Sequence, residues 1–534
     1  MAAIATPNTF SGTQSTFRVC PVTMFKVDLA AERLIIWNAV TAIVALTLGG
    51  TYALLIGLTR WPDIHLLDPA WFYRLLTAHG MNMLVFWMVF FEVAGLYFGA
   101  CVLLNARLVG ARLAWVAYAL MLLGAVMVNL VIVLSGQTIL GYKVYESGVM
   151  FSAYPPLQAD PLFYLGYILF AVGAIIACCL FLATLVMAKY EKRYEGSLPL
   201  AVFGLLTAAI IALFTLFSGA VALIPTFLWR LGVGEVDPGA YRVAFWGFGH
   251  SAQQVNLSAM IAIWYSLATL TVGAKPVNEK LSRFAFFLYI LFINLGSMHH
   301  LLVDPGIGSP AKFFNTSYAM YLAVLGSLIH AFSIPAAVEV TMRKKGYNKG
   351  LFGWLLNAPW KEPGFSALIF SLFIFGFVGG PTGVVLGAGQ LNLLAHNTWR
   401  ITGHFHATVV GGTTLAFMGF TYYVIPLIFR RPLFARRLAQ WQPWVFGTGL
   451  ILMTTMMTWA GYLGAPRRHW DVTFTDAAKV GLPVTLQPLL NLTLTLTGIA
   501  ALIAVTGGIM YVVVCVGSLF MPKREARALS PLEA

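Results

Sequence analysis

The chain has 534 residues, of which 59% are hydrophobic and only 10% are charged, and its mean hydropathy is +0.81. This composition excludes an ordinary soluble globular protein, because the apolar runs repeatedly reach the roughly 20 residues that a bilayer-spanning helix needs. The net charge of +14 is concentrated beside these runs, so it favours contact with anionic membrane lipid and gives no case for a nucleic-acid partner.

An all-α fold of twelve membrane-spanning helices is predicted, as one domain at 34–521 with no soluble domain inside it. Short tails at 1–33 and 522–534 flank this domain. The expected spans in chain order are 34–58, 73–104, 112–135, 161–187, 198–229, 241–273, 284–303, 311–341, 363–389, 393–429, 441–464 and 487–521.

The basic residues predict the orientation of these spans. The tails and the loops after even-numbered spans hold most of the Lys and Arg, including the clusters "AKYEKR", "RKKGYNK" and "RRPLFARR". Such loops stay on the cytoplasmic side of a membrane. We therefore expect a multi-pass protein of the plasma membrane with both termini in the cytoplasm.

Cysteine supplies no metal-binding motif. The five cysteines show neither C-x-x-C nor C-x-x-C-H spacing. The sequence therefore predicts no covalently attached haem c and no zinc ribbon, and any metal must use other ligands.

Six of the ten histidines fall at one depth, in the outer part of four predicted spans. They are His79, His250, His299, His300, His404 and His406. One histidine inside a span can be satisfied by a neighbouring helix, but ionisable groups in membranes are costly and usually functional. Six at one level predict metal or cofactor sites.

Spacing divides these histidines by task. At about 100° per residue, His404 and His406 point roughly 200° apart, so they can serve two different centres. His299 and His300 adjoin at a span end, where both can turn toward one ion, and His250 could complete a three-histidine site. Neutral imidazole suits copper or iron.

Five motifs together resemble one family. They are "HG" at 79–80, "WGFGH" at 246–250, "HHLLVDPGI" at 299–307, "HNTWRITGHFH" at 396–406 and "PRR" at 466–468. The set resembles the catalytic subunit I of the haem-copper oxidase and nitric oxide reductase superfamily, most closely the B-type oxidases. The resemblance runs from the first predicted span to the twelfth.

The resemblance implies a role for each of the six histidines. His79 and His406 would ligate a low-spin haem, His404 would ligate a high-spin haem, and the other three would hold a second metal, copper or alternatively non-haem iron. The haems would be of b or a type. Electrons would come from a small subunit with a dinuclear copper centre or from a cytochrome c.

Further residues are implied near the haem carboxylates. Arg467 and Arg468 match a pair that binds haem propionates, as planar guanidinium groups suit carboxylates; the alternative is a solvated basic loop. His396 matches a histidine near the high-spin haem propionates. The aspartate expected four residues earlier is Asn392, which weakens the expectation of the family's proton-release site.

The residue four after His250 bears on the reaction. In the A- and B-type oxidases that this sequence resembles, a tyrosine stands at this position, which is Gln254 here. C-type oxidases place the tyrosine at the position of Ile293, and the tyrosine nearest to that position here is Tyr289. Reduction of oxygen to water needs four electrons, one of them from that tyrosine. Joining two nitric oxide molecules needs only two.

We therefore predict a nitric oxide reductase, with the reaction 2 NO + 2 e⁻ + 2 H⁺ to N₂O + H₂O. Gln254 would form a hydrogen bond to bound substrate or to metal-bound water, although interhelical hydrogen bonding is an alternative role. A terminal cytochrome c or quinol oxidase that reduces O₂ is the second hypothesis. A haem-based gas sensor is the third.

Candidate proton-path residues lie on the cytoplasmic side of these ligands. Gln254, Ser258 and Tyr265 form one stripe of the sixth span. The eighth span adds Thr316 and Ser317 and ends at Glu339, and Glu92 is a buried acid of the second span. Hydroxyl groups in spans also commonly bond to their own backbone or to neighbouring helices.

Overall fold

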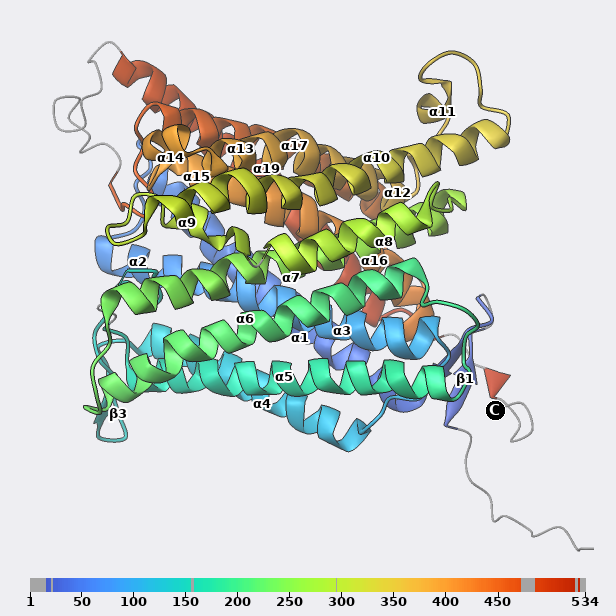
Figure 1. Ribbon diagram of the computed structural model, residues 1–534, viewed down its shortest axis with the longest axis horizontal. Coiled ribbons are helices and arrows are strands. Elements are labelled where there is room, and N and C mark those ends of the chain that lie inside the picture. Colours follow the sequence, from blue (N-terminus) through green and yellow to red (C-terminus); the bar gives the residue numbers. More distant parts are fainter. Residues whose placement is uncertain are drawn as a thin grey trace, which may run out of the picture.

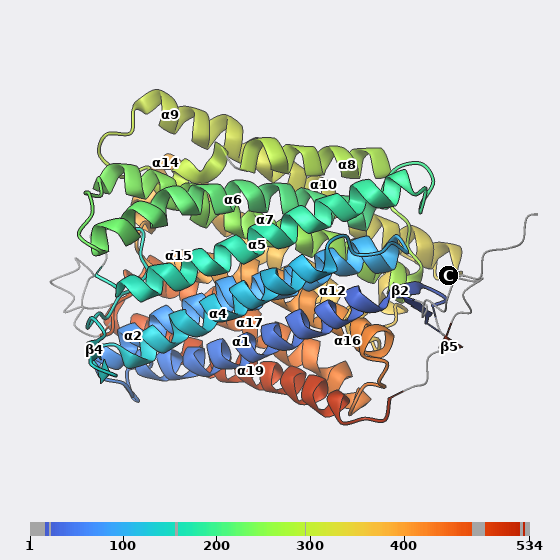
Figure 2. The ribbon, with the colours of Figure 1, turned by 90° about the horizontal axis from the view of Figure 1, so that it is seen from below.

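The computed structural model describes residues 16–20, 23–154, 158–293, 295–471, 486–523 and 527–528. Its long helices run side by side as one bundle (Figures 1 and 2). Within these residues, ten helices are long and apolar enough to cross a membrane by length and composition. They are Leu29–Arg60, Pro69–Leu103, Ala111–Leu134, Pro161–Tyr190, Leu200–Arg230, Pro238–Val272, Ser309–Lys344, Pro363–Gly387, Trp399–Phe429 and Gln487–Leu519.

The other two predicted spans are also helical, but they fall outside these ten. The segment predicted at 284–303 is broken into α8 (Glu279–Leu288), the π-helix η3 (Tyr289–Ile293) and the 3-10 helix η4 (Gly296–His300). The segment predicted at 441–464 is α17 (Arg436–Tyr462). The tenth span begins at Trp399 rather than 393, because a separate short helix, α14 (Gly389–Ala395), ends before His396.

Several spans are composed of more than one helical element. The spans that consist of a single helix include α1 (Leu29–Arg60), α4 (Ala111–Leu134), α5 (Pro161–Tyr190), α6 (Leu200–Arg230) and α19 (Gln487–Leu519), and α11 (Gly353–Leu356) is a short helix between two spans. The composite spans are α2–η1–α3–η2 (Pro69–Gly80, Met81–Trp87, Met88–Tyr97, Phe98–Leu103), α9–η5–α10 (Ser309–Phe314, Asn315–Ala319, Met320–Lys344), α12–η6–α13 (Pro363–Phe373, Ile374–Gly379, Gly380–Gly387) and α15–η7–α16–η8 (Trp399–Phe405, His406–Thr414, Leu415–Val424, Ile425–Phe429). Helix α7 (Pro238–Val272) is continuous.

Three helices each begin at an Asp-Pro pair. Asp68, Asp160 and Asp237 each accept a hydrogen bond from a backbone N–H of the first turn, and a proline follows each of them. Aspartate at the N-cap satisfies an otherwise unpaired donor, and proline at the first helical position has the backbone angle that a helix requires. These pairs therefore fix where α2, α5 and α7 enter the bundle.

Small residues allow neighbouring helices to approach closely. A Cβ atom added to Gly124 of α4 would lie 2.3 Å from the carbonyl oxygen of Gly166 on α5. A Cβ atom at Gly449 of α17 would lie 2.4 Å from the backbone nitrogen of Ala504 on α19. Close backbone packing at small residues is the usual way in which membrane helices associate.

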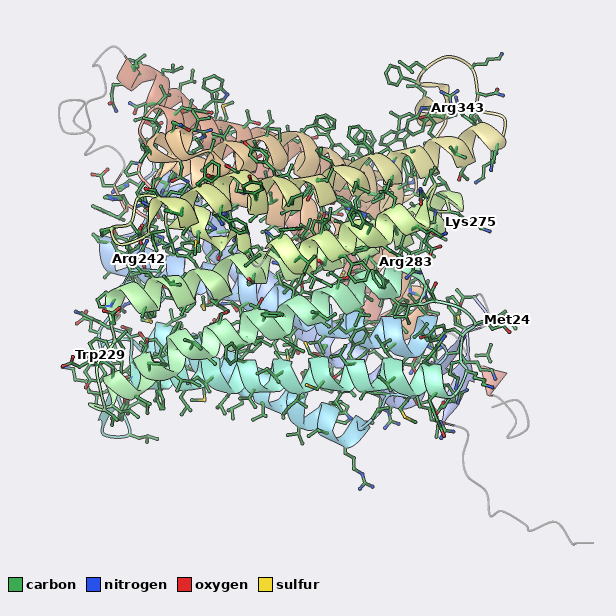
Figure 3. The ribbon with its side chains drawn as sticks, viewed as in Figure 1. Met24, Trp229, Arg242, Lys275, Arg283 and Arg343 are labelled. Carbon is green, nitrogen blue, oxygen red and sulfur yellow. The ribbon has the colours of Figure 1, made fainter. Side chains whose placement is uncertain are left out.

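The described strands lie at the ends of the bundle. At one end β1 (Phe17–Val19) pairs with β2 (Lys26–Asp28) and with β5 (Arg527–Ala528), and a hairpin of β3 (Thr138–Ile139) and β4 (Tyr142–Lys143) lies at the other. Both ends of the described chain therefore lie together, as an even number of crossings requires. Figure 3 places Lys275, Arg283 and Arg343 at that same end, and Trp229 and Arg242 at the opposite end.

Candidate metal centre

His250, His299 and His300 form a cluster that can hold a metal ion. One ring nitrogen from each lies within 4.8 Å of those of the other two, and Nδ1 of His250 is 3.3 Å from Nε2 of His300. Since metal–imidazole bonds are about 2.0 Å long, three nitrogens at such spacing can share one ion. Helix α7 supplies the first ligand and η4 the other two.

Two contacts orient the η4 histidines, and neither was predicted. The ring of His300 stacks on that of Trp246, with centroids 3.8 Å apart and planes within 5°. Nδ1 of His299 is 2.5 Å from the carbonyl oxygen of Gly296, so this nitrogen carries the proton and Nε2 is left for a metal. The "WGFGH" motif held a signal for the first contact, because tryptophan precedes His250 by one helical turn.

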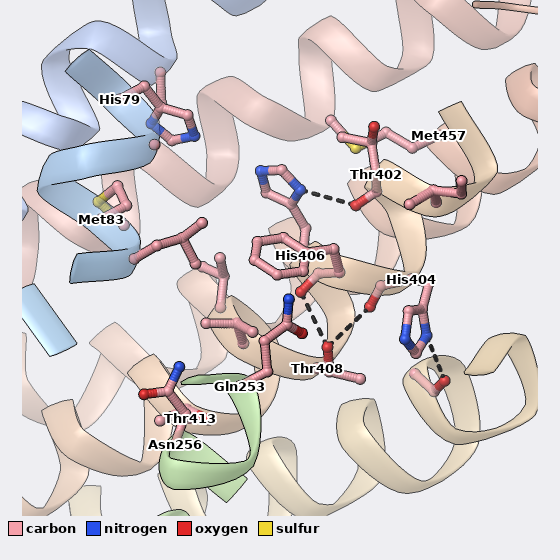
Figure 4. Close-up of a pocket in the computed structure, with 18 of the residues that line it drawn as sticks. His79, Met83, Gln253, Asn256, Thr402, His404, His406, Thr408, Thr413 and Met457 are labelled. Atoms are coloured by element: carbon pink, nitrogen blue, oxygen red, sulfur yellow. Dashed lines mark hydrogen bonds between the residues drawn. The ribbon is translucent and has the colours of Figure 1, made fainter. Parts of the chain in front are cut away.

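His79 and His406 face each other across the cavity (Figure 4). Their ring centroids are 6.1 Å apart and the ring planes differ by 11°. Nδ1 of His79 is 3.0 Å from the carbonyl oxygen of Gly49, and Nδ1 of His406 is 2.9 Å from that of Thr402. Each ring thus presents Nε2, and a metal midway needs nitrogens roughly 4 Å apart, which this separation allows.

His404 turns away from this pair. Its Nδ1 is 2.9 Å from the carbonyl oxygen of Gly379 and 3.1 Å from Oγ1 of Thr382. The carbonyl is the last of the π-helix η6, whose altered hydrogen bonding frees an acceptor, and π-helical turns are frequent at functional sites. The spacing of two residues from His406 therefore separates two centres, as the helical angle requires.

One cavity of about 1110 Å³ contains all of these ligands. Its lining includes the six histidines and also His396, Arg467 and Arg468. The volume exceeds that of a pocket for one drug-sized molecule. The free Nε2 atoms, the facing rings and the size of the cavity fit two haems and a further metal.

Arg467 and Arg468, called here the outer arginine pair, lie at the rim of this cavity. Within the described residues, neither has a carboxylate partner, and the guanidinium of Arg468 donates to Oγ of Ser152 at 3.2 Å. Burial, together with the charge of Arg468, lowers the pKa of Arg467 to about 9. Two adjacent, partly buried cations without a carboxylate partner among the described residues favour an anion, and haem propionates fit that requirement.

His396 and Asn392 lie near the same rim. Nε2 of His396 is 3.1 Å from the hydroxyl of Tyr154. Burial lowers the pKa of His396; nearby Asp304 opposes this, and Arg242 adds to it. The amide of Asn392 donates to the carbonyl oxygens of His299, at 3.1 Å, and Leu386. Where the family places a carboxylate, this chain therefore has an amide that holds a metal ligand in position.

Gln254 contacts the first metal ligand. The nitrogen of its side-chain amide lies 3.2 Å from Nε2 of His250. Its neighbour Gln253 also lines the cavity, and Figure 4 places it between His406 and Thr408. No tyrosine occupies the turn after His250, and the side chain of Ile293 lies outside the described residues.

Part of the predicted proton path forms a buried cluster. The hydroxyl of Tyr265 donates to Oγ of Ser282 at 2.9 Å and lies 3.0 Å from Nδ1 of His330. All three side chains are buried. Ser258 is also buried, and within the described part of the chain its hydroxyl has no hydrogen-bond partner.

The remaining path candidates do not join this cluster. Thr316 donates to the carbonyl oxygen of Lys312 in its own helix, and Glu339 pairs with Arg343 one turn away at 2.7 Å. Ser317 is half-buried on the same span as Thr316. Glu92 is buried on α3, with one carboxyl oxygen unpaired among the described residues, and it does not line the cavity.

The bundle and its histidine sites define a membrane-bound haem-and-metal redox protein. The family described as "Cytochrome C and Quinol oxidase polypeptide I" matches residues 33–503. The chain belongs to this family, the subunit I of haem-copper oxidases, as its motifs predict. Subunit I of these oxidases holds two haems and copper, and the cavity described above fits that set.

Curated relatives and a solved structure agree with this assignment. Cytochrome c oxidase subunit 1 of Thermus thermophilus is 31% identical over 421 residues, which is 76% of this chain and 70% of the relative. Cytochrome c oxidase polypeptide 1 of Halobacterium salinarum is 27% identical over 76% of this chain and 66% of that relative. A haem-copper terminal oxidase dimer solved by cryo-EM has the same fold, with a TM-score of 0.85, 24% identity, and coverage of 95% of this chain and 87% of that one.

Proposed function

We propose that this chain is the catalytic subunit of a respiratory gas reductase that converts nitric oxide to nitrous oxide and water. One observation carries the choice of gas. Gln254 occupies the turn beside His250, where an oxygen-reducing site needs a tyrosine that yields an electron and a proton. Its amide lies 3.2 Å from that ring and cannot be oxidised in this way.

Oxygen reduction to water is the second candidate. The relatives bear the names of cytochrome c oxidases and quinol oxidases, and these names support oxygen reduction more than nitric oxide reduction. None of the names concerns nitric oxide. The same fold and the same histidines would serve both reactions, so the choice between nitric oxide and oxygen depends on the chemistry of one turn of α7.

When bound, the haems and the metal supply electrons and an open coordination position. The protein's own contribution is orientation. If His250 ligates through Nδ1, which faces His300, its Nε2 carries the proton. The Gln254 amide, turned so that its oxygen replaces the nitrogen that lies 3.2 Å away, would then accept a hydrogen bond from this N–H. A hydrogen bond to the far nitrogen of a ligating imidazole fixes the orientation and basicity of the ligand, so we assign Gln254 a positioning role.

Protons would reach the site through the Tyr265 cluster. The hydroxyl of Tyr265 joins Ser282 to His330, and Ser327, three residues before His330, lines the cavity. The hydroxyl of Tyr289 donates to Ser327 at 3.0 Å. We infer a route in which water molecules bridge from His330 to the cavity; Glu339 remains a proposed cytoplasmic entrance and Glu92 an alternative acid.

The partners and the orientation follow from the same assignment. We propose that electrons come from a small subunit with a dinuclear copper centre or from cytochrome c. We also propose that the end of the bundle with Lys275, Arg283 and Arg343 faces the cytoplasm, where basic loops remain. The centre, at the other half of the bundle, would then take up protons across part of the membrane.

Steady-state consumption of NO and of O₂ by the purified complex tests the proposal. We expect nitrous oxide production from NO to exceed oxygen consumption, and Gln254→Leu to lose turnover while both haem spectra remain. The matched control is Gln253→Leu, the adjacent glutamine of the same cavity. Rapid water-forming oxygen reduction with negligible nitrous oxide would overturn the assignment in favour of the oxidase.

A further inference from the structure

Arg60 is an arginine of the haem cavity that none of the motifs includes. It is the last residue of α1, it is only 8% exposed, and it lines the cavity together with His79 and His406. We propose that its guanidinium binds a carboxylate of the low-spin haem, as a third arginine beside the outer arginine pair. This inference depends on the presence of that haem and not on which gas is reduced.

Arg60 has no counter-charge within the described part of the chain. Among the described residues, the guanidinium of Arg60 forms no ion pair and no side-chain hydrogen bond, and its Nε atom is buried without a partner. The guanidinium lies over the rings of Phe72, at 5.3 Å, and Trp399, at 4.9 Å. Cation–π contact offsets only part of the cost of a buried charge, so an anion is required.

The backbone places Arg60 beside the outer arginine pair. The ring of Trp399 lies under the guanidinium of Arg60, and the backbone N–H of Trp399 donates to the carbonyl oxygen of Ala465 at 2.9 Å. After α1, the indole of Trp470 donates to the carbonyl oxygen of Leu67 at 2.6 Å. Two separate ties therefore hold the end of α1 against the loop that contains the pair.

A free anion or a lipid phosphate would offer similar chemistry. A lipid headgroup at the membrane surface requires an exposed cation, and Arg60 is more than nine-tenths buried. A planar carboxylate of a group ligated by His79 can enter the cavity from within and accept two N–H bonds from one guanidinium. The haem propionate is therefore the occupant that the location favours.

The test measures the midpoint potential of the low-spin haem in the purified complex with its partner subunits. The variants are Arg60→Gln and Arg60→Lys, and the control is Arg74→Gln. Arg74 lies in α2, is also nearly buried and lies over an aromatic ring, but it pairs with Glu146 and does not line the cavity. Potentiometric titration with visible spectroscopy gives the ratio of reduced to oxidised haem without any turnover.

We expect Arg60→Gln to shift the reduction equilibrium about tenfold toward the oxidised haem, which is about 59 mV for one electron. The reason is that a nearby cation favours the reduced haem, which carries one positive charge less. Arg60→Lys keeps the positive charge but lacks the two parallel N–H donors of the guanidinium, so it should shift the potential less than Arg60→Gln does. Arg74→Gln should leave it unchanged.

Three results would overturn the proposal. The first is an unchanged potential in Arg60→Gln, and the second is an equal shift in Arg74→Gln. The third is loss of the low-spin haem from both Arg60 variants, because the charge kept in Arg60→Lys would then have no effect and the side chain would serve packing alone. Loss of that haem in Arg60→Gln with recovery in Arg60→Lys supports the proposal.

Discussion

The imidazole ring of His79 lies within 11° of parallel to the ring of His406, and the two ring centroids are 6.1 Å apart. Backbone carbonyl oxygens hold both rings through Nδ1, from Gly49 of α1 and from Thr402 of α15. Because these acceptors belong to rigid helices, the two Nε2 atoms need little rearrangement to bind one iron. We therefore propose that this pair holds the low-spin haem and that His404, which turns away from the pair, holds the other haem.

Separate substitution of His404 and His406 on the tenth span should remove the two haem signals one at a time. We expect His406→Ala to lose the low-spin absorption band and to keep carbon monoxide binding, which the high-spin haem performs. His404→Ala should lose carbon monoxide binding and keep the low-spin band. Reduced-minus-oxidised and carbon monoxide difference spectra measure both. His330→Asn, outside the ligand sets, should retain both signals; loss of both haems from either ligand variant would argue against two separate centres.

The three-histidine cluster should govern the content of the second metal. His299→Ala removes a ligand, so we expect the ratio of copper, or of non-haem iron, to haem to fall at least about tenfold while both haem spectra persist. Asn392→Ala removes the hydrogen bond from the side-chain amide to the carbonyl oxygen of His299 and should weaken metal binding by about 10- to 100-fold, as loss of a hydrogen bond that orients a metal ligand does. Elemental analysis after dialysis against a chelator measures this. Full metal retention in His299→Ala would refute the cluster as the site.

The sequence indicated which histidines lie together better than it indicated the contacts that orient them. Histidines inside apolar spans are detectable because burial of an ionisable group is costly and therefore rare. The acceptors that orient His79, His404 and His406 are mostly backbone carbonyl oxygens, which no residue type encodes. The helical fold was predictable because long apolar runs have few alternatives in a membrane.

Three other features could not be predicted from periodicity. The segment 284–303 breaks at η3 and η4, where π and 3-10 turns replace the regular helix, and a helical wheel assumes that no such break occurs. The hydroxyl of Thr316 bonds to the backbone of its own helix, so its presence in the eighth span does not by itself indicate a path. Arg60 belongs to none of the motifs. That it is buried without a carboxylate partner among the described residues becomes apparent only from the structure.

Close packing against His404 gives a prediction that requires no change in any ligand. A Cβ atom at Gly383 would lie 2.8 Å from Cε1 of His404. Gly383→Ala should therefore displace the ring, with an overpacking cost of about 1–3 kcal/mol, and should alter the carbon monoxide spectrum of the high-spin haem. Gly376→Ala, in the neighbouring η6, meets no atom within 4 Å and should leave the spectrum unchanged. Identical spectra for the two variants would mean that the ring position tolerates the contact.

The Tyr265 cluster makes the final prediction, which concerns turnover. Tyr265→Phe keeps the ring but removes the hydroxyl that joins Ser282 to His330, so turnover should slow at least about tenfold, a modest loss for an interrupted proton transfer. Haem spectra and metal content should not change. Tyr97→Phe is the matched control, because that tyrosine is equally buried and its hydroxyl has no hydrogen-bond partner among the described residues. Turnover by Tyr265→Phe at the rate of Tyr97→Phe would show that protons reach the centre by another route, and Glu92 would then be the acid to test.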